Sequence, residues 1–482
     1  MQTSISFVLD GKIVTLDFHP GSQQSPTTTV LNYLRSLPDH KGVKEGCAEG
    51  DCGACTVALG ELTAENKIRY RSIDSCLMFL PMLHGKQLIT VENLQNKNGQ
   101  LHIVQSAMVE TGGSQCGFCT PGIIMSMFSL YKNHNKPTRE QIDDAITGNL
   151  CRCTGYEPIV EAASQACIHD GIDHFTDNEP TVVELLKSIS RESIFIKTKD
   201  QEYFRPNNIE EALSLKSKYP QASILSGSTD VALRVTKGFE VLPQLIDISG
   251  VNELHSLQET ADTLTLGAGI VLNDVLHAVK NKFPALCDIL SVFGSQQIRN
   301  VATLGGNLGT ASPISDTLPV LMAYNATIVL QSINTKHEMS LVDFILGYRT
   351  TARKPDELIT AVRLSKSQNG AIIKSYKISK RNDLDIATIS AGFRLELNND
   401  RQVNKIILSY GGMADRIKRA STVEQFLTGK RWNRESVEEA MPLMSHDFVP
   451  ISDARASAEF RQIAAKNLLL KFWADTMNHE QR

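Results

Sequence analysis

The sequence predicts a multidomain α+β protein, in which small modules of strands and helices follow one another along the chain. A length of 482 residues suits about three or four domains of ordinary size. Stretches in which apolar and polar residues alternate, as in strands, are followed several times by stretches with the apolar spacing of helices. Eight of the ten cysteines gather between residues 47 and 153. These observations predict several separate cores, with the cysteine chemistry confined to the first third of the chain.

Residues 1–90 are predicted to form a small α+β module. Apolar and polar residues alternate on both sides of Asp10-Gly11, which is a strong hairpin signal. A threonine cap and an apolar pattern from Val30 to Leu34 predict a helix after the hairpin. A loop rich in glycine and cysteine comes next. Hairpin, helix and loop together are typical of a ferredoxin-like module.

Residues 91–169 are predicted to be helical. Pro121 suits the first turn of one helix, and Thr138 suits the cap of another. One pair of cysteines precedes a predicted helix, and a second pair follows one. Helix ends carry unsatisfied backbone N–H groups, which stabilise the negative charge of nearby thiolates. The pattern therefore predicts a helical domain with its cysteines at helix ends.

The rest of the chain is predicted to hold a linker and two further α+β domains. Residues 170–200 begin with an acidic stretch that contains Pro180, which predicts a linker with a short helix. Helical and strand patterns alternate over residues 201–370. Residues 371–482 show strand patterns first and helical patterns afterwards.

The clustered cysteines form two groups whose spacing suits iron–sulfur clusters. The first group reads C-x4-C-x2-C with a distant fourth cysteine, which is the plant-type 2Fe–2S ferredoxin spacing. The second group pairs C-x2-C with a later C-x-C. We therefore predict two clusters, and two such cofactors imply electron transfer between them. The predicted ligands are Cys47, Cys52, Cys55 and Cys76 in the first group and Cys116, Cys119, Cys151 and Cys153 in the second.

Two other uses of these cysteines stay open at this point. Disulfides are disfavoured because the N-terminus lacks the basic and apolar regions of a secretory signal, which favours a reducing compartment. Structural zinc could use two C-x2-C pairs, but their C-x4-C and C-x-C partners fit a zinc ribbon poorly. Cys167 and Cys287 stand alone and are predicted to be buried apolar cysteines.

Composition narrows the class of protein. Apolar residues make up 41% of the chain, but no run approaches the roughly 18 residues of a membrane span. A net charge of −4 gives no basic surface for nucleic acid or anionic membrane. We therefore expect a soluble cytoplasmic protein that binds neither nucleic acid nor membranes.

Two glycine-rich stretches, Leu225–Val231 and Gln297–Asp316, could let backbone N–H groups approach phosphates. Ordinary tight turns are the alternative for each stretch. The P-loop motif is absent, and Gly267-Ala268-Gly269 lacks the third glycine of the Rossmann fingerprint. A dinucleotide would therefore bind on a different fold. No metal-spaced histidine pair and no nucleophile triad is present in the sequence.

Several of these motifs resemble the molybdenum hydroxylase family, and within it the xanthine dehydrogenases. The stretches GCAEGDCGACTV, QCGFCTPG and GNLCRCTGY are similar to the two cluster signatures of that family. LSGSTD, QIRNVATLGGN with TASPISD, and YKISKRNDLDIA resemble its FAD domain. The resemblance implies a β-grasp 2Fe–2S domain, a helical 2Fe–2S domain, a two-part non-Rossmann FAD-binding domain and a C-terminal α+β domain.

The resemblance also implies roles for particular residues. Cys116, Cys119, Cys151 and Cys153 would hold the cluster nearest the molybdenum, and Gln115 would reach the pterin of the molybdenum cofactor. The other four cysteines would hold the cluster nearer the flavin. The implied FAD residues are Leu225, Ser226, Gly227, Ser228, Thr229, Asp230, Val231, Phe293, Thr303, Gly306, Asn307, Asp316, Ile359 and Lys377. Ser228 departs from the family, where asparagine is common at this position.

The resemblance implies a partner, because family members with one chain continue into a molybdopterin domain, whereas this sequence ends at Arg482. We expect the small subunit of a bacterial-type xanthine dehydrogenase, paired with a large molybdopterin-binding subunit in a dimer of heterodimers. Substrate would be oxidised on the partner, so no catalytic residue is expected here. Electrons would pass through the two clusters to FAD and on to NAD.

Two other functions stay open. The large subunit could oxidise an aldehyde, nicotinate or another heterocycle with the same electron-transfer chain. The protein could instead be a stand-alone iron–sulfur flavoprotein that carries electrons without a molybdenum partner.

Overall fold

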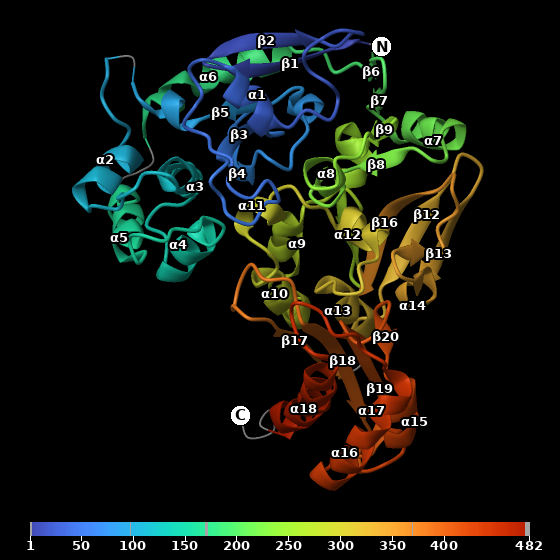
Figure 1. Cartoon of the computed structure of the whole chain (residues 1–482). Coiled ribbons are helices and arrows are strands. Elements are labelled where there is room, and N and C mark those ends of the chain that lie inside the picture. The colour runs from blue at the N-terminus through green and yellow to red at the C-terminus, as the bar shows by residue number, and fades with distance from the viewer. Residues whose placement is uncertain (1, 97, 169–171, 369, 478–482) are drawn as a thin grey trace. The chain divides into compact units, whose positions relative to one another are not determined.

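The computed structural model describes residues 2–96, 98–168, 172–368 and 370–477 (Figure 1). The chain divides into two compact units. The first runs to Asn252 and also includes Gly294–Ala302, whereas the second comprises Glu253–Phe293 and the chain from Thr303 onward. The predicted boundary between residues 169 and 170 lies outside the described residues. No helix among the described residues is long and apolar enough to cross a membrane.

The first module of the first unit is the predicted ferredoxin-like fold. Its five-stranded sheet has the order β2-β1-β5-β3-β4, with β1 and β5 parallel. Asp10 and Gly11 both adopt positive φ and close the β1–β2 hairpin, as predicted. Thr29 caps α1, whose apolar side packs on the sheet. The elements are β1 (Ser4–Leu9), β2 (Lys12–Asp17), α1 (Val30–Ser36), β3 (Thr56–Leu62), β4 (Ile68–Asp74) and β5 (Gln87–Ile89).

The second module is a cluster of four helices around one apolar core, as the sequence predicted (Figure 1). Thr138 caps α4 by accepting a hydrogen bond from the backbone N–H of Gln141. The buried middle of α3 runs through the centre of this core. The helices are α2 (Ile103–Glu110), α3 (Thr120–Asn133), α4 (Arg139–Ile146) and α5 (Glu157–Ala166).

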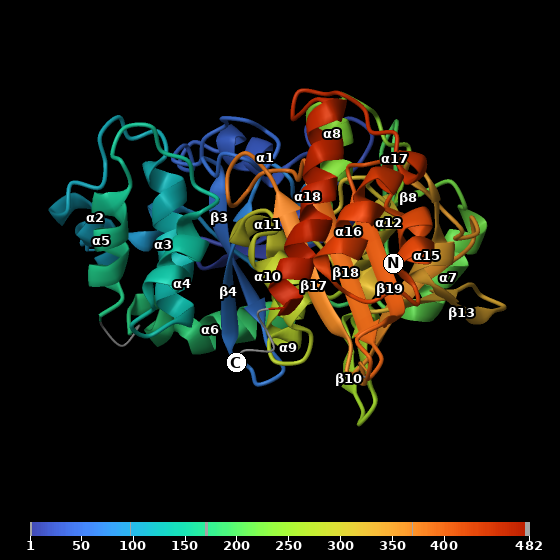
Figure 2. The ribbon, with the colours of Figure 1, turned by 90° about the horizontal axis from the view of Figure 1, so that it is seen from below.

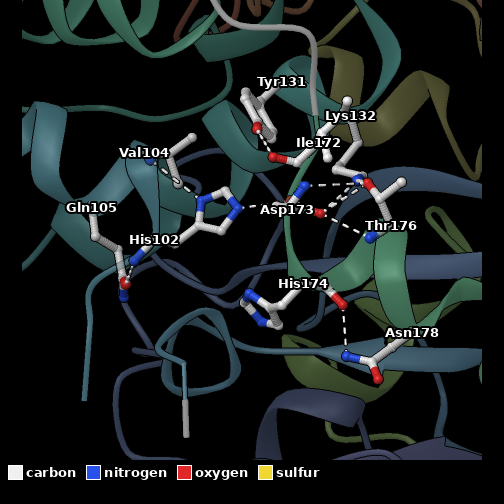
Figure 3. A network of polar contacts seen from close by, with 10 residues as sticks. All are labelled: His102, Val104, Gln105, Tyr131, Lys132, Ile172, Asp173, His174, Thr176 and Asn178. Atoms are coloured by element: carbon white, nitrogen blue, oxygen red, sulfur yellow. Dashed lines mark hydrogen bonds and ion pairs between the residues drawn. The ribbon is translucent and has the colours of Figure 1, made fainter. Parts of the chain in front are cut away.

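The segment predicted as a linker contains a longer helix than expected, α6 (His174–Ser188). Asp173 caps this helix and accepts hydrogen bonds from His102 and Lys132, each at 2.8 Å (Figure 3). His102 in turn caps α2, because its Nδ1 accepts from the N–H of Val104. The buried network therefore anchors α6 to the helical module, and Pro180 lies inside the helix rather than ending it.

The last part of the first unit is a four-stranded sheet of order β6-β7-β9-β8 with two helices. The short helix α11 belongs to this unit although it lies far along the chain. Its elements are β6 (Ile194–Lys197), β7 (Glu202–Arg205), α7 (Ile209–Lys218), β8 (Ser223–Leu225), α8 (Val231–Thr236), β9 (Gln244–Asp247) and α11 (Gln296–Arg299).

The second unit contains two larger sheets. The first has the order β10-β11-β16-β12-β13. Its elements and adjoining helices are β10 (Leu257–Glu259), β11 (Thr263–Gly267), α9 (Leu272–Val279), α10 (Pro284–Ser291), α12 (Leu304–Thr310), α13 (Thr317–Ala323), β12 (Thr327–Gln331), β13 (Lys336–Ser340), α14 (Leu341–Phe344) and β16 (Leu358–Ser365). Two short strands, β14 (Ile345–Gly347) and β15 (Thr350–Thr351), pair with each other as a separate sheet.

The second sheet of this unit has the order β17-β18-β19-β20 and carries the C-terminal helices. Figure 2 shows α18 lying along this sheet, where Leu469 and Phe472 enter the shared core. On the other face, Gly392 of β18 meets the backbone of α13 so closely that a Cβ atom would overlap it. The elements are β17 (Ile372–Ile378), β18 (Ile389–Leu397), β19 (Val403–Gly411), β20 (Lys418–Arg419), α15 (Ser421–Leu427), α16 (Arg434–Ala440), α17 (Met444–Asp447) and α18 (Ala458–Met477).

Candidate iron–sulfur and flavin sites

The first cysteine group lies on the loop between α1 and β3, with the fourth cysteine directly after β4. The thiols of Cys47 and Cys52 lie close enough to shift each other's pKa, and the same is true of Cys55 and Cys76. Two backbone N–H groups, from Glu49 and Asp51, donate to the Cys47 sulfur at 3.4 Å each. The four thiols of this group thus form two pairs.

The electrostatics of this loop favour a thiolate at its more exposed end. The hydrogen bond with Cys52 lowers the pKa of Cys47 to about 5, against the effect of burial and with help from the backbone N–H groups. The hydrogen bond with Cys76 and complete burial raise the pKa of Cys55 well above its usual value. Backbone N–H groups that point at sulfur are the donors that tune a cluster's thiolates.

The second cysteine group lies at helix ends, as predicted. Cys116 and Cys119 precede α3, whereas Cys151 and Cys153 lie between α4 and α5. The thiols again form two pairs, Cys116 with Cys153 and Cys119 with Cys151. Cys116, Cys153 and the predicted pterin neighbour Gln115 are exposed. This group therefore lies at the surface of its unit.

The pairing of the thiols distinguishes between the possible occupants. All ten cysteines are free, so no disulfide is formed among them. Among the described residues, no group of three or more His, Cys, Asp or Glu side chains is arranged to hold a single metal ion. A 2Fe–2S cluster takes two thiolates on each iron. Two pairs of thiols at each site therefore fit a 2Fe–2S cluster.

The two cysteine loops contact each other directly. The backbone N–H of Leu150 donates to the carbonyl oxygen of Cys52 at 3.0 Å. The side chain of Asn149 donates to the carbonyl oxygen of Gly53 and to the hydroxyl of Thr56, both at 3.0 Å. The Leu150–Cys52 hydrogen bond thus links a predicted ligand of the first cluster to the residue directly before Cys151, a predicted ligand of the second.

The first glycine-rich stretch forms a tight turn between β8 and α8. Ser228 adopts a left-handed conformation with φ of 57°, in which asparagine and glycine are the more usual residues. A Cβ atom at Gly227 would overlap the carbonyl oxygen of Val301, so this position requires glycine. The Ser228 hydroxyl donates to the carbonyl oxygen of Leu77. Leu77 follows Cys76, so this turn touches the first cysteine group.

The other predicted flavin residues lie in the second unit. The Thr303 side chain caps α12 by accepting from the N–H of Gly306 at 3.1 Å. The Asn307 side chain accepts hydrogen bonds from the hydroxyls of Ser315 and Thr317. Ile359 lies buried on β16, and Phe293 is half-buried after α10. These contacts hold the turn before Asp316 against α12.

Asp316 and Lys377 form a buried ion pair with 2.8 Å between their charged atoms. Burial raises the pKa of Asp316 to about 6, although the charge of Lys377 opposes this shift. The Lys377 ammonium also donates to the carbonyl oxygen of Val292 at 2.8 Å. The pair therefore ties the start of α13 to β17 and to the end of α10.

A pocket of about 450 Å³ opens beside this ion pair in the second unit. It lies between α10 and β17 and is lined by Lys377, Lys380 and Arg381, among others. Two nitrogen atoms of Arg381 donate to Asp385 at 2.7 Å each, which fixes the loop after β17. The lining also includes Asp288, and because Lys377 and Arg381 are each paired with a carboxylate, Lys380 is the lining cation for which no ion pair is described.

Sequence reasoning missed three residues that join the cysteine modules: Asn149, Gln297 and Asn300. Asn149 lies within the motif GNLCRCTGY, two residues before Cys151, and its amide could have been noticed as a polar side chain beside the predicted ligands. Gln297 and Asn300 belong to a stretch that was interpreted only through its glycines. Their partners are more than a hundred residues away, and no local pattern indicates them.

Three family models match the chain. The FAD binding domain in molybdopterin dehydrogenase matches residues 197–366, a 2Fe–2S binding domain matches residues 90–164, and the CO dehydrogenase flavoprotein C-terminal domain matches residues 374–476. The FAD-binding match includes residues of both units.

Similar proteins carry related names. The xanthine dehydrogenase of Emericella nidulans is 32% identical over 98% of this chain and 39% of its own length. The xanthine dehydrogenase/oxidase of Gallus gallus is 32% identical over 97% of this chain and 40% of its own length. The chain thus spans about two fifths of the length of these relatives.

Solved structures share the fold over part of the chain. A carbon monoxide dehydrogenase from Hydrogenophaga pseudoflava matches with a TM-score of 0.53 and 24% identity, over 55% of this chain and 93% of its own. Quinoline 2-oxidoreductase from Pseudomonas putida 86 matches with a TM-score of 0.52 and 22% identity, over 57% of this chain and 95% of its own.

The matched domains and the paired cysteines define an iron–sulfur flavoprotein. The chain belongs to the molybdenum hydroxylase family, and its cofactors are 2Fe–2S clusters and FAD.

Proposed function

We propose that this chain is the electron-transfer component of a xanthine dehydrogenase. The observation that carries the proposal is the continuous contact among three parts of the first unit. The Leu150–Cys52 hydrogen bond joins the two cysteine groups, and the Ser228–Leu77 hydrogen bond joins the first group to the glycine-rich turn. This order of contacts suits electrons that enter at the exposed cysteine group and leave through a flavin.

Each cysteine group is proposed to hold one 2Fe–2S cluster. The paired thiols of each group support this assignment, as does the match of a 2Fe–2S binding domain to the helical module. Gln115 lies exposed beside Cys116, which suits contact with a molybdenum cofactor on a partner. The proposed partner is a large molybdopterin-binding subunit, in a dimer of heterodimers.

We propose domains at residues 1–90, 91–169, 201–370 and 371–482, with a linker at 170–200.

FAD is the proposed flavin cofactor. The residues proposed to bind it are the turn Leu225–Val231 in the first unit and, in the second unit, Thr303, Asn307 and the Asp316–Lys377 pair. When bound, FAD supplies one-electron exchange with the clusters and two-electron exchange with an acceptor. The glycine-rich turn offers backbone N–H groups without side chains in the way. The protein's own task is to orient the cofactor and to set the polarity around it.

NAD is the proposed acceptor, and the pocket beside Lys377 is its proposed site. The lining cations Lys377, Lys380 and Arg381 suit the pyrophosphate of a dinucleotide.

The names of the relatives favour xanthine as the substrate oxidised on the partner. Quinoline 2-oxidoreductase shares the fold, which keeps another heterocycle as the second candidate. A cytoplasmic location is proposed for the protein.

The proposal is tested by visible spectra of the natively purified protein with any partner it retains. Anaerobic xanthine should bleach the cluster and flavin bands, and NAD should then restore them. Bleaching by dithionite but not by xanthine would contradict the proposed substrate. Bleaching by xanthine with recovery only in oxygen would contradict NAD as the acceptor.

A further inference from the structure

Gln297 lies at the junction of the two cysteine-bearing modules. Its side chain is fully buried, and its amide nitrogen donates to the Ser126 hydroxyl at 2.7 Å and to the Ala145 carbonyl oxygen at 3.0 Å. The same nitrogen lies 3.2 Å from the Asn149 side-chain oxygen. The Ser126 hydroxyl donates to that oxygen at 2.6 Å. Gln297 and Ser126 therefore hold the oxygen end of the Asn149 amide.

The nitrogen end of the Asn149 amide crosses to the other module. It donates to Gly53, which lies between Cys52 and Cys55, and to the hydroxyl of Thr56. The position of this amide thus depends on Gln297 at one end and fixes the first cysteine loop at the other. Asn149 itself lies two residues before Cys151. Its position therefore affects the cysteine loops of both modules.

The residues that flank Gln297 strengthen this junction. Arg299 is 1% exposed and forms an ion pair with Asp144 at the end of α4. The Asn300 side chain donates to the carbonyl oxygen of Ser72 on β4 at 2.9 Å. One short segment thus contacts the helical module through Gln297 and Arg299 and the ferredoxin-like module through Asn300.

The packing at this junction leaves no room for adjustment. A Cβ atom at Gly148 would overlap the side chain of Gln297. A Cβ atom at Gly53 would overlap the Gly148 carbonyl oxygen, and one at Gly122 would overlap the Gly53 carbonyl oxygen. Three glycines therefore permit the close approach of Gln297 and the two cysteine loops.

We propose that Gln297 is a positioning residue for electron transfer between the two cluster sites. This inference rests on the proposed function, because it requires a cluster at each cysteine group. The step is the passage of one electron from a reduced cluster to an oxidised one, with no bond made or broken. Gln297 acts through Asn149, whose amide sets the separation and orientation of the loops that hold the ligands.

The test replaces Gln297 by methionine, which keeps the length of the side chain but removes its hydrogen bonds. A second variant, Ser126→Ala, removes the hydroxyl that links Gln297 to Asn149. Gln296→Met, on the same short helix, is the matched control. Each variant is purified as the full chain with any partner it retains, its iron content is measured, and both clusters are reduced with dithionite.

Two readouts need no substrate. The first is the low-temperature electron paramagnetic resonance spectrum, in which the splitting between two reduced clusters depends on their separation and orientation. The second is measured on a separate, fully oxidised sample: the rate at which an electron added by flash photoreduction equilibrates between the two clusters. Because electron transfer slows as the separation between the two clusters increases, the rate should fall severalfold in Gln297→Met.

The expected result is a changed splitting and a slower rate in Gln297→Met and Ser126→Ala, with Gln296→Met like the wild type. Unchanged splitting and rate in Gln297→Met would overturn the inference. If Gln297→Met fails to take up iron, the same two measurements are made on Ser126→Ala, and unchanged splitting and rate in that variant would overturn the inference. Wild-type protein without two cluster signals would overturn the proposed function, whereas two signals without reduction by xanthine would remove only the proposed substrate.

Discussion

Ser228 donates a hydrogen bond to the carbonyl oxygen of Leu77, the residue that follows Cys76. The glycine-rich turn and the first cysteine group are therefore in direct contact, although 151 residues separate the two partners. The turn that we propose to bind FAD and the loop that we propose to hold a cluster therefore share one hydrogen bond.

Removing this link should weaken the fold of the turn. We expect Ser228→Ala to lower the free energy of unfolding by about 1 kcal/mol, because a buried carbonyl oxygen loses its donor. Ser228→Gly is the matched control, since it also removes the hydroxyl but relieves the positive φ. Denaturant unfolding of the two variants measures the difference. If Ser228→Ala were as stable as the wild-type protein or more stable, the assigned hydrogen bond would be contradicted.

The second cysteine group should be needed for electron entry but not for flavin binding. We expect Cys119→Ser to retain FAD and to lose its reduction by xanthine, because one iron loses a thiolate while the flavin turn is untouched. Cys167→Ser is the control, since Cys167 is buried and belongs to neither group. Flavin content and anaerobic bleaching are the measurements. Normal reduction of FAD by xanthine in Cys119→Ser would exclude this group from the electron route.

The contacts of Asp173 with His102 and Lys132, which hold α6 to the helical module, should weaken at low pH. Hydrogen bonds from His102 and Lys132 hold the pKa of Asp173 well below its usual value, although burial opposes this. A carboxylate with a lowered pKa stabilises the fold above its unfolded value of about 3.9, and that stability is lost as the pH falls further. Figure 3 shows the contacts that protonation would break.

Asp173→Asn should therefore destabilise the protein at neutral pH by about 3 kcal/mol, because a buried lysine loses its partner. It should also lose less stability on acidification than the wild type. Asp177→Asn, on the same helix and exposed, is the control. Unfolding curves at neutral and acid pH provide the comparison, and identical pH profiles for Asp173→Asn and wild type would refute the anchor.

The Asp316–Lys377 pair should show the opposite pH dependence. Burial raises the pKa of Asp316 to about 6, so its contribution to stability declines as the pH rises from about 4 towards that value. Lys377→Met leaves a buried carboxylate without its cation and should cost about 3 kcal/mol above pH 6.

The double variant Asp316→Asn with Lys377→Met isolates this pair. It should recover most of the stability that Lys377→Met loses, because no charge is left buried. Denaturant unfolding of the two single variants and the double variant at neutral pH gives the coupling energy. Additive losses would show that the ion pair contributes nothing of its own.

Local signals explain what could be predicted from the sequence. Asp10-Gly11 closes a hairpin and Thr29 and Thr138 cap helices because turns and caps depend on a few adjacent residues. The cysteine spacing indicated iron–sulfur clusters because cluster ligands lie close together in the chain. The paired thiols are consistent with that expectation, and the family is confirmed by the matched domains.

Long-range placement explains what could not be predicted. Gly294–Ala302 joins the first unit although its neighbours in the sequence belong to the second. Its side chains form hydrogen bonds and an ion pair with distant backbone groups and side chains, and such contacts leave no periodic pattern in the sequence. Pro180 suggested a linker, but the cap at Asp173 and its buried partners support a helix through that position.

The most direct test of the account is a count of iron and spin in the purified full chain. Two clusters with two irons each predict about four irons per chain and, after reduction with dithionite, two distinct 2Fe–2S signals. Cys76→Ser should abolish one signal and Cys153→Ser the other. Loss of both signals in each variant, or about one metal ion per cysteine group, would contradict the assignment of one 2Fe–2S cluster to each group.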